Sequence, residues 1–157
     1  MALAACTRLD SGETVRAGAT GRRGIAIADR TRYPPRGRAE VTSASVLLVD
    51  DEALIRMMVA DMVEELGHRV AAEAGTLEAA IAAARDSTFD VALLDVNLEG
   101  LAVTPVARIV HERGLPFIFA SGYGVAGIPE EFRERPVLQK PFATDALKRQ
   151  LDAILDR

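Results

Sequence analysis

Several polar side chains in this sequence follow directly, or within two residues, after short apolar runs. They are the acidic pair Asp50-Asp51, the single Asp95, the hydroxyl of Ser121 and the ammonium group of Lys140. Any one acidic residue in such a place is commonly a turn former or a helix cap. Three carboxylates, one hydroxyl and one ammonium group gathered at one place would instead indicate metal or phosphoryl chemistry, because like charges repel unless a counter-ion joins them. The elements that carry these residues therefore decide what they can do.

The apolar runs before these residues predict buried β-strands. Continuous runs cover residues 46–49, 91–94 and 117–120, and shorter runs cover 70–72 and 137–138. Runs of this length without polar alternation are typical of strands covered on both faces of a parallel sheet.

Apolar residues at helical spacing lie between the predicted strands. The four stripes are Ile55, Met58, Val59, Met62 and Leu66; Leu77, Ala80, Ile81 and Ala84; Val103, Val106, Ala107 and Val110; and Leu147, Leu151, Ile154 and Leu155. We expect Thr76 to cap the second helix, and Gly67 and Gly114 to end the first and third. Residues 122–135 contain three glycines and Pro129, which leave little room for a full helix.

The alternation of strands and helices predicts a doubly wound α/β domain, with right-handed crossovers and helices on both faces of the sheet. All carboxyl ends of parallel strands lie at one edge, and open α/β sheets bind their ligands in the crevice there. The acidic residues, Ser121 and Lys140 are therefore expected to converge.

A cluster of carboxylates at this edge favours a bound divalent cation. Two carboxylates ~4 Å apart repel by about 4 kcal/mol at an effective dielectric of ~20, and a cation relieves this repulsion. Few carboxylates with open water positions suit Mg²⁺, since Ca²⁺ prefers more oxygen ligands and the sequence has no EF-hand loop or His/Cys cluster. Beside Mg²⁺ a carboxylate can attack phosphorus and form an aspartyl phosphate. Lys140 would balance the phosphoryl oxygens, and Ser121 would hydrogen-bond to them.

Composition indicates one domain with an extension before it. The chain has 157 residues, 49% hydrophobic residues and one cysteine, which fits a cytoplasmic protein without disulfides or a membrane span. Residues 1–43 are rich in Gly and Arg and hold eight arginines against four acidic residues, a net charge of +4; residues 44–157 hold 11 basic and 19 acidic residues, a net charge of −8. We therefore expect a flexible extension over 1–43 and an acidic domain over 44–157, which disfavours nucleic acid binding.

Two further hypotheses concern the extension. One is that its arginines bind an anionic partner. The other is that residues before Val41 are not translated, because Val41 stands just before the domain and could be encoded by an alternative start codon. An intact Met1 or Ala2 terminus in protein from the native source would exclude the second hypothesis.

Four segments resemble the receiver domain of two-component response regulators (CheY-like). They are Val46-Leu47-Leu48-Val49-Asp50-Asp51-Glu52, Leu93-Leu94-Asp95-Val96-Asn97-Leu98, Ala120-Ser121-Gly122-Tyr123 and Lys140-Pro141-Phe142. The resemblance covers residues 45–156 and implies a flavodoxin-like sheet of five strands in the order 2-1-3-4-5. It implies that Asp95 accepts the phosphoryl group with the help of Mg²⁺.

The resemblance also implies a role for each neighbouring residue. Asp51 and Asp95 would contact Mg²⁺ directly, Asp50 would act through water, and the Asn97 carbonyl would complete the protein ligands. Ser121 and Lys140 would contact the phosphoryl group, and the Lys140-Pro141 peptide bond would be cis.

Residues 116–124 are similar to the signature of the single-domain FAT GUY regulators, which implies a histidine kinase of the HWE or HisKA2 type as partner. Ser121 stands where Thr is usual in that signature, and Tyr123 comes one place early. Val137 occupies the place, three residues before Lys140, where receivers commonly carry a switch aromatic. The alternatives for Tyr123 are a part in the switch and simple packing.

The predicted function is therefore a bacterial single-domain response regulator that signals through protein contacts. We expect a monomer or weak dimer that is not an enzyme beyond slow self-phosphorylation and autodephosphorylation. The alternatives are a phosphohydrolase with an aspartyl-phosphate intermediate, a nucleotide-binding module and an unphosphorylated scaffold receiver. A phosphohydrolase usually carries an Asp-x-Asp nucleophile motif, but the residue two places after Asp95 is Asn97. No Gly-x-Gly-x-x-Gly follows the first strand, which argues against a nucleotide site. We expect His68 and His111 to be surface residues.

Overall fold

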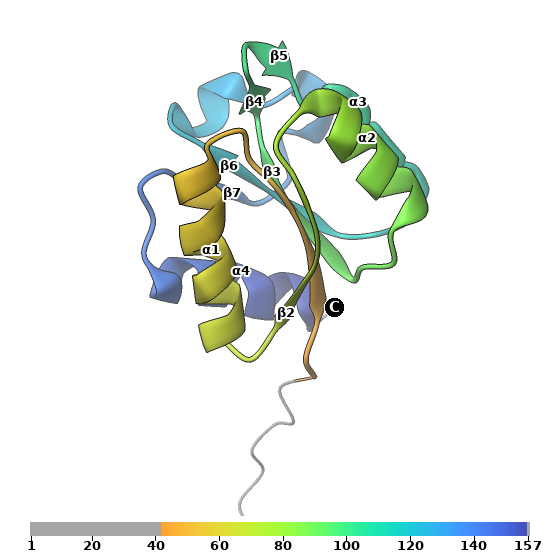
Figure 1. Cartoon of the computed structure of the whole chain (residues 1–157). Coiled ribbons are helices and arrows are strands. Elements are labelled where there is room, and N and C mark those ends of the chain that lie inside the picture. The colour runs from red at the N-terminus through yellow and green to blue at the C-terminus, as the bar shows by residue number, and fades with distance from the viewer. Residues whose placement is uncertain (1–41, 157) are drawn as a thin grey trace, which may run out of the picture. The chain divides into compact units, whose positions relative to one another are not determined.

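Five parallel strands form one sheet at the centre of the domain (Figure 1). The structure is a computed structural model that describes residues 42–156. In sheet order the strands are β2 (Arg69–Ala74), β1 (Ser45–Val49), β3 (Val91–Asp95), β6 (Phe117–Ser121) and β7 (Val137–Gln139). All neighbouring pairs in this sheet are parallel. Since β4 and β5 form a separate hairpin, this is the predicted 2-1-3-4-5 order, and the doubly wound α/β fold is confirmed.

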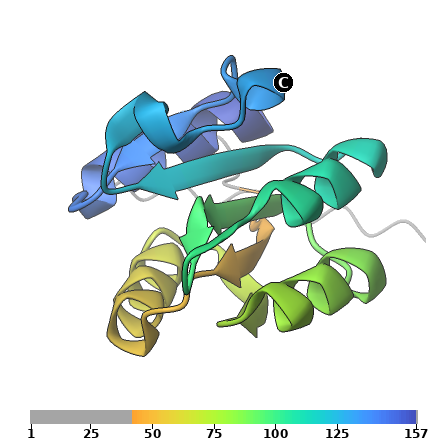
Figure 2. The same cartoon turned by 90° about the horizontal axis from the view of Figure 1, so that it is seen from above.

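Helices cover both faces of the sheet, as Figure 2 shows from above. They are α1 (Ala53–Glu65), α2 (Leu77–Asp86), α3 (Thr104–Glu112) and α4 (Thr144–Leu155). Successive strand residues point to opposite faces, so each strand contributes to two cores. Phe119 packs in the core under α2 and α3, whereas its neighbour Ile118 packs in the core under α1 and α4, and both side chains are fully buried.

The helices end where the predicted signals place their ends, but the buried face of α1 differs from the prediction. Thr76 caps α2, because its hydroxyl oxygen accepts a hydrogen bond from the Ala79 N–H at 3.2 Å. Gly67 has a φ of +83° and stands just beyond α1, as the predicted stop requires. The predicted stripe of α1 is partly wrong: Met58 is 49% exposed, and Val63 is fully buried and faces the core. The stripe was assigned from spacing alone, whereas α1 packs on β1 and β2 with Val59 and Val63 as its buried residues.

No full helix forms between β6 and β7, as predicted. The segment makes two short 3₁₀ turns, η2 (Gly124–Gly127) and η3 (Glu130–Phe132). Phe132 is buried and meets the ring of Phe117 edge-to-face, with 5.4 Å between the ring centroids. This aromatic contact anchors η3 on the core beside α3.

The hairpin of β4 (Asn97–Leu98) and β5 (Leu101–Ala102) was not predicted. Its two-residue loop has positive φ angles at Glu99 (51°) and Gly100 (86°), which is the requirement of a type I′ turn. Leu98 is 1% exposed and holds the hairpin on the core. Strands of two residues carry no readable periodicity, and Glu-Gly is not among the common hairpin signals, so the sequence gives little sign of this element.

The prediction for His68 was wrong. Its side chain is 8% exposed, and its ring Nδ1 accepts a hydrogen bond from the Ala44 N–H at 3.1 Å. The turn after α1 lies over the start of β1, which no local pattern around His68 indicates. His111 is exposed, as expected. The predicted extension over 1–43 falls outside the described residues except for Thr42 and Ser43.

Candidate functional site

Three carboxylates meet at the carboxyl edge of β1 and β3. The two strands are neighbours with Val49 opposite Leu94, so Asp50 and Asp95 follow side by side. One carboxylate oxygen each from Asp50, Asp51 and Asp95 lies within 4.8 Å of the others. Asp50 and Asp95 are 3% and 7% exposed, and Asp51 is half-buried. The expected convergence of the acidic residues is thus observed.

Lys140 joins this cluster from the loop after β7. Its Nζ donates hydrogen bonds to Oδ2 of Asp50 at 2.7 Å and to Oδ2 of Asp95 at 3.0 Å. The Lys140-Pro141 peptide bond is cis, as the resemblance implied. Because β7 is two strands away from β3 in the sheet, only a long side chain can reach both carboxylates.

Burial and pairing act in opposite directions on these charges. Burial raises the pKa of the Asp95 carboxyl, although hydrogen bonds from Lys140 and from the Asn97 N–H hold part of that rise back. Burial by itself would lower the pKa of Lys140, but the hydrogen bonds to Asp50 and Asp95 outweigh it, and the pKa is raised. Lys140 is therefore a firmly charged ammonium group in an anionic pocket.

Backbone amides also hold one oxygen of each carboxylate. The Glu52 N–H donates to Oδ1 of Asp50 at 2.9 Å, and the Asn97 N–H donates to Oδ1 of Asp95 at 3.2 Å. The Glu99 N–H, in the left-handed turn of the hairpin, donates to Oδ2 of Asp51 at 2.9 Å. Sequence reasoning missed all three donors, because a backbone N–H carries no residue-type signal.

Asn97 lies at the start of the hairpin beside Asp95. Its side-chain Oδ1 accepts a hydrogen bond from the Gly100 N–H at 2.7 Å and so closes the turn. The expected role of its carbonyl as a metal ligand remains a prediction.

Ser121 lies at the end of β6, between β3 and β7. It is fully buried, and its hydroxyl oxygen accepts a hydrogen bond from the Tyr123 N–H at 3.1 Å. The side chain of Tyr123 is 82% exposed, so it is not packed in a core. Ser121 and Lys140 are linked through the backbone, where the Lys140 N–H donates to the Ser121 carbonyl at 2.9 Å.

The donor set fits Mg²⁺. Three carboxylates converge without any sulfur or imidazole ligand among them, and hard oxygen ligands are what Mg²⁺ prefers. Within residues 42–156 no buried side-chain polar atom lacks a hydrogen-bond partner, so the pocket is an ordered arrangement in which Lys140 balances part of the charge.

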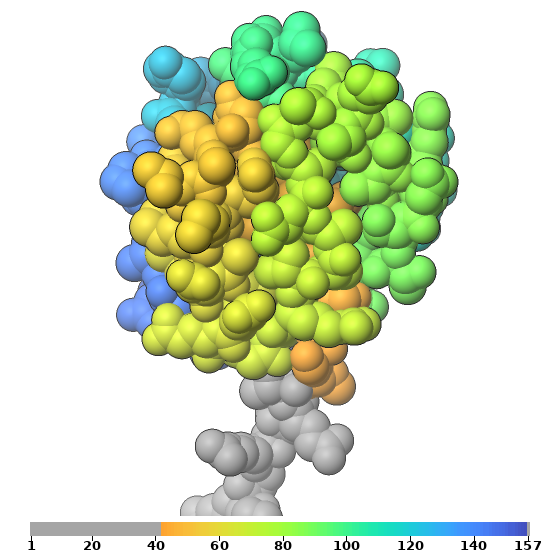
Figure 3. Space-filling model, in the orientation of Figure 1, coloured from red at the N-terminus to blue at the C-terminus, as the bar shows by residue number. Residues whose placement is uncertain are grey.

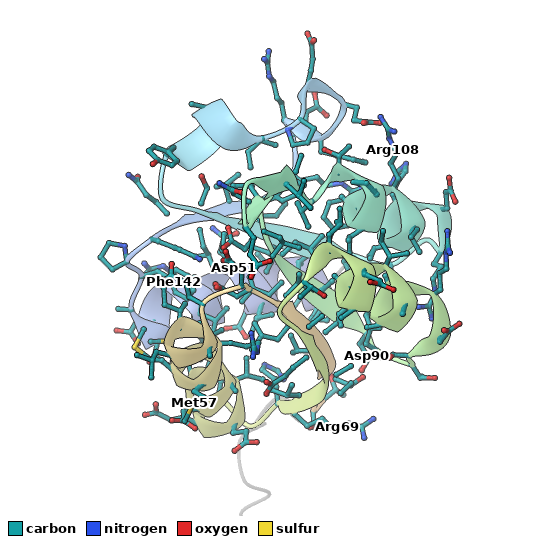
Figure 4. The ribbon with its side chains drawn as sticks, turned by 45° about the horizontal axis from the view of Figure 1, so that its top comes forward. Asp51, Met57, Arg69, Asp90, Arg108 and Phe142 are labelled. Carbon is teal, nitrogen blue, oxygen red and sulfur yellow. The ribbon has the colours of Figure 1, made fainter. Side chains whose placement is uncertain are left out.

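An apolar groove adjoins the cluster. It has a volume of about 350 Å³ and lies between the start of α1 and the loop after β7, with Ile55, Met58 and Phe142 in its lining together with Lys140. Figure 4 shows Asp51 and Phe142 at the N-terminal end of α1 and Met57 farther along that helix, and Figure 3 shows α1 on the molecular surface. Met57 is 64% exposed and Leu54 is 81% exposed. A larger cavity of about 740 Å³, beside η3 and α4, shares no lining residue with the acidic cluster.

Fold and pocket together define a class: a doubly wound α/β domain with an acidic cluster and a lysine at the carboxyl edge of its sheet. The chain belongs to the response regulator receiver domain family, whose model matches residues 46–152. It is thus a receiver domain of two-component systems. In the part of the chain that the structure describes, no helix is both long and apolar enough to cross a membrane.

Several solved structures are similar to this chain. The solution structure of SdrG from Sphingomonas melonis Fr1 is 40% identical with a TM-score of 0.64, and the match covers 72% of this chain and 97% of SdrG. A BeF₃-activated conformation of SdrG, from Pseudomonas melonis Fr1, is 42% identical over 71% of this chain and 95% of SdrG, with a TM-score of 0.62. The receiver domain of the PhyR response regulator from Erythrobacter litoralis is 29% identical over 73% of this chain and 91% of that domain, with a TM-score of 0.64.

Among relatives compared by sequence, the transcriptional regulatory protein PdtaR of Mycobacterium tuberculosis is 28% identical over 116 residues, which are 71% of this chain. The chain spans only 57% of PdtaR's length, so the activity and partners of that protein as a whole are not carried over.

Proposed function

We propose that this receiver domain accepts a phosphoryl group on Asp95 from a histidine kinase and passes the signal on through protein contacts. The observation that carries the proposal is the contact of Lys140 with both buried carboxylates, at 2.7 and 3.0 Å, beside a third carboxylate. The pocket places three carboxylates around the ammonium group of Lys140, and this excess of negative charge supports a role for a divalent cation.

The transfer would break the P–N bond of a phosphohistidine and form a bond between phosphorus and a carboxylate oxygen of Asp95, while the imidazole leaves with the electron pair. Asp50, Asp51 and Asp95, with the Asn97 carbonyl, would hold Mg²⁺, which when bound neutralises charge on the pocket and on the phosphoryl oxygens. Lys140 is in reach of Asp95 and would move onto a phosphoryl oxygen.

Ser121 is our candidate for the first residue that senses the modification. Its hydroxyl oxygen accepts a hydrogen bond from the Tyr123 N–H, and its O–H can donate to a phosphoryl oxygen. A turn of the side chain toward the phosphoryl group would therefore be felt at the Tyr123 backbone. Val137 is at the usual position of the switch aromatic, so we propose that the loop with Tyr123 responds in its place. The exposed side chains of Tyr123 (82%) and Val125 (66%) would then change the surface that a partner meets.

The proposed partner is a histidine kinase, of the HWE or HisKA2 type on the resemblance of residues 116–124. The exposed Leu54, Met57 and Met58 of α1, with the apolar groove beside Lys140, offer such a partner a surface next to the acceptor. The match to SdrG, which also has a solved BeF₃-activated conformation, supports a receiver that takes up an activated state. The proposed compartment is the cytoplasm.

Intact-mass analysis after incubation with acetyl phosphate and Mg²⁺ tests this proposal. We expect the natural protein to gain the mass of one HPO₃ group and Asp95→Asn to gain none, because the amide cannot act as the acceptor. An equal gain in both proteins would exclude Asp95. Rapid multiple turnover of a phosphate ester would instead favour the phosphohydrolase, and no gain in either protein would favour the scaffold receiver.

A further inference from the structure

Arg56 of α1 reaches the backbone of the acidic pair. Its Nη1 donates a hydrogen bond to the Asp50 carbonyl oxygen at 2.7 Å, and its Nε donates to Oε2 of Glu73 at 3.3 Å. The bond to the carbonyl is partly buried, whereas the bond to Glu73 is exposed, so the contact to the carbonyl is the better shielded one. A charged group is thus placed on the peptide unit that joins Asp50 to Asp51.

Gly75, in the turn between β2 and α2, leaves the space that this guanidinium occupies. A Cβ atom at Gly75 would lie 2.8 Å from Nη1 of Arg56. The φ of Gly75 is outside the left-handed region, so its backbone does not require glycine. The absence of a side chain at this position therefore serves the close approach of Arg56.

Three contacts hold the backbone on and around the Asp50-Asp51 peptide. The Asp50 N–H donates to the Ala74 carbonyl at 3.1 Å, and the Glu52 N–H donates to Oδ1 of Asp50 at 2.9 Å. The third is the Arg56 bond to the Asp50 carbonyl. Because a peptide unit is planar, holding its carbonyl also fixes the direction in which the chain enters Asp51.

We propose that Arg56 is a positioning residue of the phosphoryl site, which directs the carboxylates of Asp50 and Asp51 into the pocket, and that Gly75 is required to admit it. The part that concerns phosphorylation rests on the function proposed above; the part that concerns the orientation of the carboxylates does not. The positive charge of Arg56 alone would weaken Mg²⁺ binding, whereas its contact with the Asp50 carbonyl strengthens it. The two effects have opposite signs and can be separated.

Two single variants and their combination provide the test. Gly75→Ala keeps the charge and displaces only the flexible end of Arg56, whereas Arg56→Met removes both the charge and the hydrogen bond. We expect the dissociation constant for Mg²⁺, from titration followed by amide chemical shifts, to rise about tenfold in Gly75→Ala, as for other partners that orient metal ligands. In Arg56→Met the rise should be smaller, because loss of the positive charge offsets part of the loss of the hydrogen bond. The double variant should bind Mg²⁺ no more weakly than Arg56→Met, because both changes remove the same contact, the Arg56 bond to the Asp50 carbonyl.

A second measurement needs no metal. In the natural protein without Mg²⁺ the amide hydrogens of Asp50 and Glu52 should exchange slowly, and both variants should make them exchange faster while α4 amides keep their rates. Glu73→Ala is the matched control, since it removes only the exposed partner of Arg56 and should change Mg²⁺ binding by less than about twofold.

Three results would overturn the proposal: an unchanged dissociation constant in Gly75→Ala, tighter Mg²⁺ binding in Arg56→Met, or effects that add in the double variant. Gly75→Ala lies at an unstrained position and is expected to fold, since such changes are usually neutral or slightly stabilising. If the natural protein takes no phosphoryl group from acetyl phosphate, the proposed function fails. The titration and the exchange rates still decide the role of Arg56.

Discussion

Lys140→Met should expose the repulsion that Lys140 now balances. The substitution keeps a long apolar stem and removes the ammonium group that contacts both buried carboxylates. Oxygens of Asp50 and Asp95 lie within 4.8 Å of each other. Two unit charges at that distance repel by about 3.5 kcal/mol at an effective dielectric of ~20. We expect the free energy of unfolding without Mg²⁺ to fall by about 2–4 kcal/mol at neutral pH.

The loss should depend on pH in a defined direction. Burial already raises the pKa of Asp95, and the hydrogen bond from Lys140 holds it back, so the substitution should raise the pKa further. A carboxyl whose pKa is raised in the folded state contributes stability that is fully present below its unfolded pKa of about 3.9 and is lost as pH rises through the folded pKa. The deficit of Lys140→Met should therefore be smallest in acid and grow as pH rises through the folded pKa of Asp95.

Urea unfolding of both proteins across this pH range, with EDTA and with Mg²⁺, gives the measurement. Mg²⁺ should stabilise Lys140→Met more than the natural protein, because it relieves a larger repulsion and binds only the folded state. Lys148→Met is the matched control: Lys148 pairs with Asp152 on the exposed face of α4, and its loss should cost about 0–1 kcal/mol. Equal stability of Lys140→Met and the natural protein in EDTA at neutral pH, or a deficit that does not change with pH, would refute the electrostatic reasoning.

Three further predictions concern the rest of the domain. The N–H and hydroxyl of Ser45 both donate to Oδ2 of Asp90 at 2.7 Å and lower the pKa of Asp90. The Asp90 carboxylate therefore contributes stability that is present above about pH 3.9 and is lost as pH falls through its folded pKa. Asp90→Asn should cost about 1 kcal/mol at neutral pH and flatten the acid limb of the stability curve in urea titrations; an unchanged acid limb would contradict this. Gly100→Val should strain the left-handed turn that holds the Glu99 N–H on Asp51 and weaken Mg²⁺ binding measured by titration, whereas Glu99→Asn suits the turn and should not. Removal of residues 1–41 should leave the urea midpoint of unfolding unchanged if the domain begins where predicted. A shorter chain that also lacks residues 42–44 loses the hydrogen bond between the Ala44 N–H and the His68 ring and should unfold at a lower urea concentration. A large shift on the first removal would place the domain boundary earlier.

Much of the fold could be read from local patterns. The apolar runs before Asp50, Asp95 and Ser121 predicted their strands, because only strands buried on both faces stay apolar without alternation. Since parallel strands share a carboxyl edge, the convergence of the acidic residues followed from their place after those runs. Thr76 and Gly67 marked helix ends through side-chain and backbone preferences that act within one turn.

Tertiary structure alone decided the long-range contacts that hold the site residues. Lys140 meets Asp50 across 90 residues of sequence, and the Ala44 N–H meets His68 across 24. The Glu99 N–H on Asp51 and the Arg56 bond to the Asp50 carbonyl involve backbone atoms that every residue possesses. Residue type and spacing report which side chains a segment carries and which face they share. They do not report which distant backbone group comes within hydrogen-bond distance, because that depends on how helices and loops pack on the completed sheet.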